Sequence, residues 1–392
     1  MNKTLTIGKV PYTPEEAGYD SLYIERLNEF IERSINEKHI QGGSYYLMRN
    51  GKLFANNSMG ALDYRFPEKP LLPDSIKRIA SITKNYTAVA IMQLAERGYL
   101  TTQDPVAMHL DEFDTPLHKT ITIYNLLTHT SGLLAEDGAF EEPYSNYWVR
   151  HVDSFDGNWI KAMLTQPFHC KPNTQWIYSS PCFCILGEVV KRISGMAFET
   201  YVMENIVKPL GLKDTFYDIP KDKLERVIVA CEHEIPDHDE DESESDEKSS
   251  HGDDKHWALL PRAGWGLYST LADQNIFSQM LLNNGFFNNQ RIIGRKSVEN
   301  LTHAHLYHDN FRNYCWGADK VHEFGLGFEV MSKKQTNHMT PGTYGHEGAG
   351  VCWNYADPKE NFIAGMFLPY HNGEFNIKPI HRSKYIIWSG LI

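Results

Sequence analysis

Strand-like segments lie near both ends of this chain of 392 residues, with helical patterns between them. Near the start, a β-rich region at 44–56 is interrupted by Asn50-Gly51, a dipeptide that favours the positive φ angles of a tight hairpin turn. Short β-rich runs return at 327–331 and 361–368. A sheet built from both ends, with helices between, predicts one α/β unit into which a helical unit is inserted.

This pattern also predicts where the regions begin and end. We expect the sheet region to comprise residues 1–75 and 258–392, and the helical region to comprise residues 76–231. An acidic segment at 232–257 separates the two. We therefore predict a discontinuous organisation rather than two consecutive domains.

Most of the negative charge belongs to the acidic segment. The formal net charge is −12, and residues 232–255 hold twelve Asp and Glu against two Lys, which leaves 38 acidic and 36 basic residues elsewhere. Such a run cannot bury enough apolar surface to fold alone, so we expect a solvated loop; a lid over a cleft or a cation-binding segment are the alternatives. The nearly neutral remainder has no basic stripe, which argues against nucleic-acid binding.

The chain also lacks the patterns of membrane, secreted and metal-binding proteins. No stretch approaches eighteen uninterrupted apolar residues, and the first ten residues have no apolar signal core, so we expect a cytoplasmic protein without a membrane span. The six cysteines show no CxxC spacing, which predicts buried thiols. The eighteen histidines form no HExxH motif, so we predict no metal site.

Ser81 and Lys84 form the sharpest chemical pattern, at the start of a helix predicted over 81–95. A spacing of three places both side chains on one face, one turn apart. A serine hydroxyl needs a base to take its proton, and a partly buried lysine can serve. These features are those of an acyl-enzyme on Ser81, and an ordinary N-cap serine is the alternative that spacing and context leave open. Ser245 and Lys248 repeat the spacing, but within the acidic segment.

Several further segments carry a family resemblance: 79–84 (IASITK), 94–98 (LAERG), 126–133 (LLTHTSGL), 208–212 (KPLGL), 264–270 (GWGLYST) and 325–328 (GLGF). In this order they resemble the serine β-lactamase and penicillin-binding-protein-like superfamily, and most of all its class C β-lactamase-related branch. That branch includes D-alanyl-D-alanine carboxypeptidases, D-aminopeptidases, family VIII esterases and acyltransferases.

The resemblance implies both a fold and a reaction. The implied fold is of the α+β class, β-lactamase/transpeptidase-like, with helices flanking an antiparallel sheet and an inserted all-helical region. The implied reaction uses Ser81 as nucleophile with help from Lys84, and requires no metal or organic cofactor.

The second motif of the family, Tyr-x-Asn, has two candidate matches. Residues 144–146 (YSN) have the right residue types, but no helical pattern closely follows them. Tyr178 begins a Tyr-Ser-Ser segment that runs into the helical pattern at 185–190, as this motif does in the family. The resemblance therefore favours Tyr178, which would share base and acid duties with Lys84. Ser180 then occupies the Asn position at the substrate, where its shorter arm disfavours recognition of an acylamino side chain.

The third motif, Lys-Thr-Gly or His-x-Gly, is best matched at 346–348 (HEG), because a strand-like run follows at 351–353. A second His-x-Gly at 371–373 lacks that strand. The resemblance places the motif strand beside the nucleophile and makes the backbone N–H groups of Ser81 and Ala349 the oxyanion hole.

His346, Glu347 and Gly348 are accordingly expected to contact substrate, together with Ser180. His346 stands where the family often has a permanently charged lysine. If Glu347 faces the cleft, it repels the carboxylate of β-lactams and of D-Ala-D-Ala peptides; strand alternation could instead direct it to solvent.

These observations predict a serine hydrolase that acts on a small ester, amide or peptide, without nucleic-acid or membrane partners. A β-lactamase, a D-alanyl-D-alanine carboxypeptidase, an acyltransferase and a sensor protein with little turnover are the alternatives. His129 and Ser131 are expected to hold a turn near the site rather than to react.

Overall fold

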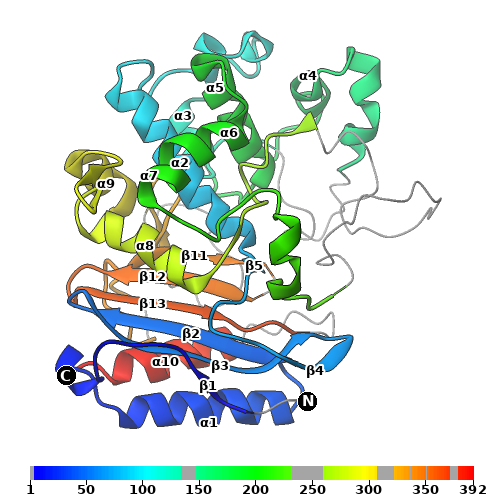
Figure 1. Ribbon diagram of the computed structural model, residues 1–392. Coiled ribbons are helices and arrows are strands. Elements are labelled where there is room, and N and C mark those ends of the chain that lie inside the picture. Colours follow the sequence, from blue (N-terminus) through cyan, green and yellow to red (C-terminus); the bar gives the residue numbers. More distant parts are fainter. Residues whose placement is uncertain are drawn as a thin grey trace.

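Nine strands in the described part of the chain form one antiparallel sheet, which lies across the lower half of Figure 1. The computed structural model describes residues 4–133, 146–231, 259–306, 322–334, 337–349, 351–370 and 378–392. The spatial order is β1-β3-β2-β13-β12-β11-β10-β9, with β4 paired to β3. The bounds are β1 (Thr6–Ile7), β2 (Gly42–Arg49), β3 (Lys52–Asp63), β4 (Phe66–Pro70), β9 (His322–Phe324), β10 (Glu329–Met331), β11 (Tyr344–Gly348), β12 (Cys352–Asp357) and β13 (Phe362–Phe367).

The two ends of the chain meet inside this sheet. β2 pairs with β13, with Met48 opposite Ile363, so strands from the first and last parts of the chain are neighbours. The predicted hairpin joins β2 to β3, with Asn50 at φ 52° and Gly51 at φ 74°, the left-handed conformation that this turn requires. The α+β class predicted from the sequence is confirmed, whereas the exact region boundaries stay a prediction.

One face of the sheet is covered by α1 (Leu22–Asn36) and α10 (Lys378–Ser389), which lie below it in Figure 1. On α1 the buried side chains Leu27, Phe30, Ile31 and Ile35 recur at helical spacing, which gives one apolar stripe towards the sheet. They share a core with aromatic residues of β12 and β13. This layer therefore uses the first and last helices of the chain to cover the back of the sheet.

The opposite face carries α8 (Leu271–Leu282) and, above it, the helical region. At its centre runs α2 (Thr83–Glu96), which is buried on every side from Thr83 to Leu94, including polar side chains such as Lys84 and Asn85 in its first turn. Around it lie α3 (Ile123–Leu127), α5 (Ser180–Ser194), α6 (Phe198–Val202) and α9 (Arg295–Thr302). One continuous core joins these helices to the upper face of the sheet, so the start of α2 stands at the junction of the two layers.

Three predicted features lie outside the described residues: the acidic segment, the His-x-Gly match at 371–373, and Tyr144 of the alternative second motif. Among the residues that are described, no helix is both long enough and apolar enough to cross a bilayer.

Candidate active site

Ser81 lies in a short 3₁₀ turn (Ala80–Ile82) that links β5 (Lys77–Arg78) to α2. β5 is held by pairing with β6 (Tyr268–Ser269), and the Ile79 N–H donates to the Leu267 carbonyl at 2.9 Å. Immediately before Ser81, Ala80 has φ +45°, a left-handed conformation that costs a residue with a side chain about 1–3 kcal/mol. The surrounding structure therefore imposes a strained backbone at the proposed nucleophile.

Lys84 is completely buried one helical turn after Ser81. Its Nζ lies 3.1 Å from Ser81 Oγ, 2.8 Å from Ser180 Oγ and 2.8 Å from the Gly264 carbonyl. These bonds use the three donors of an ammonium group. Gly264 has to be glycine for this, since a Cβ there would come within 2.9 Å of Ser180 Cβ. The helical spacing has brought the predicted base to the predicted nucleophile.

Tyr178 is also buried beside Lys84. The Lys84 Nζ lies 4.7 Å from the centre of the Tyr178 ring and 5.6 Å from that of Phe183. The segment holding Tyr178 leads directly into α5, whose N-cap Ser179 accepts from the Cys182 N–H. The structure thus places the Tyr178 ring against Lys84, which in turn contacts Ser81. The alternative Tyr144 lies outside the described residues.

His129 fixes the segment that carries Tyr178. Its carbonyl accepts from the Ile177 N–H at 2.8 Å, and its Nδ1 accepts from the Ser179 N–H at 3.1 Å. Burial, and then the nearby Lys84 charge, lower the pKa of His129 well below its usual value, so the ring is neutral. His129 holds the backbone on both sides of Tyr178, in agreement with the structural role predicted for it.

The strand β11 passes the Ser81 turn at very close range. A Cβ on Gly348 would lie 2.4 Å from the Ile79 carbonyl, so glycine is needed for this approach. Ala349 follows directly and is exposed, next to the buried strand. The predicted oxyanion-hole residues therefore lie on adjoining segments of the structure.

His346 is buried on β11, and its Nδ1 donates to the Glu347 carbonyl. Burial, followed by the charge of Lys84, lowers the pKa of His346 to about 3. The imidazole is therefore neutral near pH 7. In contrast to a lysine at this position, it presents no positive charge to a substrate.

One predicted substrate contact needs correction. Glu347 points to the other side of β11, where its carboxylate forms an ion pair with Lys384 of α10, because successive side chains of a strand face opposite ways. Glu347 therefore does not face the cleft. Ser180 is buried and its oxygen accepts from Lys84, and its contact with a substrate stays a prediction. The sequence offered no local signal for either partner, since both pairs are distant along the chain.

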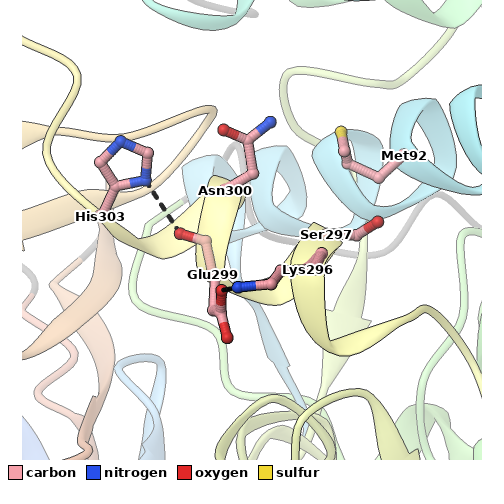
Figure 2. Close-up of a pocket in the computed structure, with 6 residues that line it drawn as sticks. All are labelled: Met92, Lys296, Ser297, Glu299, Asn300 and His303. Carbon is pink, nitrogen blue, oxygen red and sulfur yellow. Dashed lines mark hydrogen bonds and ion pairs between the residues drawn. The ribbon is translucent and has the colours of Figure 1, made fainter.

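A separate hollow lies on α9, away from this site (Figure 2). It is lined by Met92, Lys296, Ser297, Glu299, Asn300 and His303. Met92 lies eight residues after Lys84, about 12 Å further along α2. Figure 2 shows Glu299 paired with Lys296, and His303 bonded to the Glu299 carbonyl. These are ordinary contacts within and at the end of a helix, so the hollow takes no part in the chemistry at Ser81.

The described residues also contain no group of three or more His, Cys, Asp or Glu side chains arranged to hold a metal ion.

Comparisons with known proteins extend over most of the chain. A family model described as Beta-lactamase matches residues 27–377. Protein Rv1367c of Mycobacterium tuberculosis (strain ATCC 25618 / H37Rv) is 27% identical over 370 residues, which cover 86% of this chain and 88% of that protein. Protein flp of Staphylococcus aureus (strain MW2) is 30% identical over 196 residues, or 49% of this chain, and the match spans only 38% of that protein.

Solved structures show the same architecture. A penicillin-binding protein homolog from Caulobacter crescentus has a TM-score of 0.72 at 18% identity, covering 98% of this chain and 99% of its own. EstCE1, described as a hydrolase with promiscuous acyltransferase activity, also has a TM-score of 0.72 at 18% identity, covering 93% and 98%. At this level of identity the likeness concerns the fold, and it confirms the β-lactamase/transpeptidase-like architecture.

Proposed function

This chain belongs to the beta-lactamase family, and from that premise we propose that it is a serine hydrolase that acts through a Ser81 acyl-enzyme on a small ester or amide/peptide substrate. The observation that carries the proposal is the 3.1 Å contact between Lys84 Nζ and Ser81 Oγ at the buried start of α2. A serine hydroxyl with a lysine in hydrogen-bond range is one arrangement that can activate a serine nucleophile.

In the acylation step, Ser81 Oγ attacks the substrate carbonyl carbon and loses its proton to the pair formed by Lys84 and Tyr178. The ammonium form of Lys84, which donates to three oxygens, has no lone pair with which to accept a proton. Tyr178 therefore acts as the base in its phenolate form, which the adjacent ammonium stabilises, and it becomes a neutral phenol when it takes the Ser81 proton. The same proton passes to the leaving group as the carbon–heteroatom bond breaks. Water adds to the acyl-enzyme by the reverse sequence.

The developing oxyanion is assigned to the backbone N–H groups of Ser81 and Ala349. The strained Ala80 and the close approach of Gly348 to the Ile79 carbonyl support this assignment, because they hold the two segments together before any substrate binds.

The charge pattern favours neutral substrates. His346 is neutral, with its pKa lowered to about 3, and the charge of Glu347 is paired with Lys384. A substrate carboxylate therefore gains no ion pair from the third motif, and a neutral ester or amide loses no binding energy by lacking a carboxylate. We accordingly place ester or amide hydrolysis ahead of β-lactam or D-Ala-D-Ala cleavage. Acyl transfer uses the same residues, and the described activity of EstCE1 makes it the second candidate. A cytoplasmic location stays a prediction.

The test is the intact mass of the protein after treatment with a fluorophosphonate and, separately, with p-nitrophenyl acetate. Wild type is expected to gain one adduct and to turn over the ester, and Ser81→Ala to do neither. Ser245→Ala is the matched control, because it removes the serine of the second Ser-x-x-Lys pair in the sequence. A wild-type protein without adduct or turnover would contradict the proposal.

Substrate class is tested with p-nitrophenyl esters, D-aminoacyl anilides and a chromogenic cephalosporin. We expect kcat/KM to be highest for the uncharged esters. Faster turnover of the cephalosporin than of simple esters would show that carboxylate-bearing substrates are preferred.

A further inference from the structure

Lys384 is a fully buried lysine on α10, on the side of the sheet away from Ser81. Its ammonium forms an ion pair with the Glu347 carboxylate on β11. The same nitrogen lies 4.6 Å from the centre of the Tyr355 ring and 5.9 Å from that of Trp353. Because burial of a lone ammonium is strongly unfavourable, the carboxylate and the ring faces are what stabilise it here. A helix at the end of the chain is thereby tied to the third-motif strand.

The ion pair between Lys384 and Glu347 bears on how β11 is oriented about its own axis. Side chains alternate along a strand, so Glu347 faces α10 while its neighbours His346 and Gly348 face the opposite side, where Gly348 meets the Ser81 turn. Holding Glu347 therefore fixes the direction of His346 and of the backbone N–H that follows Gly348.

The first half of β11 is clamped from both sides. β10 pairs with Tyr344 and Gly345, and β12 pairs on the other side. Tyr355 of β12 lies across Gly345, where a Cβ would be 2.7 Å from the ring, and its hydroxyl donates to Glu329 of β10. The strand is therefore well fixed up to Gly345.

The second half of β11 has fewer constraints. From His346 to Gly348 the described residues supply strand pairing on the β12 side alone, with Glu347 opposite Trp353. This half also carries the groups that have to be aligned with Ser81. The ion pair to α10 is the additional anchor at this point.

We propose that Lys384 is a positioning residue for the Ser81 reaction, whose ion pair with Glu347 holds the end of β11 so that His346 and the Ala349 N–H stay aligned with Ser81. The proposal rests on the proposed function. Lys384 touches no reacting atom and acts through the strand. Misplacement of an aligned group by about 1 Å can lower a rate by about 100-fold, so loss of this anchor has a measurable effect on kcat.

The experiment compares wild type, Lys384→Arg, Lys384→Met and the double variant Lys384→Met/Glu347→Gln. The double variant leaves no unpaired buried charge, so it separates positioning from a general loss of stability. Each protein is characterised by its single-turnover acylation rate with p-nitrophenyl acetate, by KM, and by amide hydrogen exchange of residues 344–349. Lys208→Met is the control, since it breaks an exposed ion pair with Glu204.

We expect the double variant to acylate about tenfold or more slowly, with KM changed less than about twofold and with faster exchange at 346–349. Lys384→Arg, which keeps the charge, should recover part of the rate, and Lys208→Met should match wild type. A double variant with wild-type acylation and exchange overturns the proposal. If wild type forms no adduct, the proposed function fails and the catalytic role of Lys384 fails with it, while faster exchange in the variants still establishes the anchor itself.

Discussion

Lys84 and Lys384 are both completely buried, on opposite faces of the same sheet, and their partners differ. The acceptors described for Lys84 are neutral oxygens, two hydroxyls and one carbonyl. Lys384 faces a carboxylate and two aromatic rings. The carboxylate neutralises the buried charge of Lys384, whereas the acceptors described for Lys84 satisfy its hydrogen bonds without an opposite charge. The front face therefore holds a lysine whose ammonium is directed at the proposed nucleophile, and the back face holds one suited to anchoring.

The strongest test of this comparison is Lys84→Met. We expect the acylation rate with p-nitrophenyl acetate to fall by about 10²–10⁴-fold, because the cation that stabilises the Tyr178 phenolate and the contact of that cation with Ser81 Oγ are both lost. Lys248→Met, in the second Ser-x-x-Lys pair, is the matched control and should acylate normally. If Lys84→Met keeps more than about a tenth of the wild-type rate, Lys84 is not the residue that activates Ser81.

The stability of the two lysine variants should show the reverse order. Lys384→Met leaves the Glu347 carboxylate without its buried partner, which typically costs about 3–5 kcal/mol of unfolding free energy. Lys84→Met leaves the neutral acceptors described for Lys84 unbonded, at about 1–3 kcal/mol. Urea denaturation measures both values. Equal losses of unfolding free energy in the two variants would contradict the difference described between Lys84 and Lys384.

The sequence predicted the local part of this site. Ser81 and Lys84 are three residues apart on one helix, so helical geometry alone brings them together. The contacts of Lys84 with Ser180 and Gly264 join segments about 100 and 180 residues away, and no local pattern specifies them. The Tyr178 segment was chosen through the family resemblance rather than through its own spacing.

The orientation of Glu347 illustrates a second limit of the sequence. Alternation predicts that Glu347 and His346 face opposite ways, but it does not say which face holds the nucleophile. β12 and β13 are buried throughout, so neither face of the sheet looks polar in the sequence. The partner of Glu347 lies on a helix 37 residues later, and only the three-dimensional arrangement reveals it.

Gly348→Ala probes the front face at its tightest contact. The added methyl group would lie 2.4 Å from the Ile79 carbonyl and 2.6 Å from Cys352 Sγ, so β11 and the Ser81 turn have to separate. Overpacking of this kind costs about 1–3 kcal/mol of stability. We expect slower acylation with little change in KM, measured alongside thermal unfolding. Wild-type acylation in this variant would show that the close approach of β11 is not needed for the reaction.

The smallest expected effect is the pH dependence of stability caused by the neutral imidazole on the front face. Burial, and then Lys84, lower the pKa of His346 from 6.5 to about 3 in the folded protein. Below pH 6.5 the imidazole binds a proton in the unfolded chain but not in the folded protein. The stability that depends on the neutral His346 is therefore fully present above pH 6.5 and is lost as the pH falls towards 3. Between pH 7.5 and 5.5 the loss is about 1.4 kcal/mol.

His346→Asn should remove the contribution of His346 to the pH dependence of stability. The buried His129 contributes to that dependence in both proteins. Urea denaturation at the two pH values measures the difference. An unchanged slope would mean that the pKa of His346 is the same in the folded and the unfolded protein, so that the imidazole would carry a positive charge on the front face at pH 5.5.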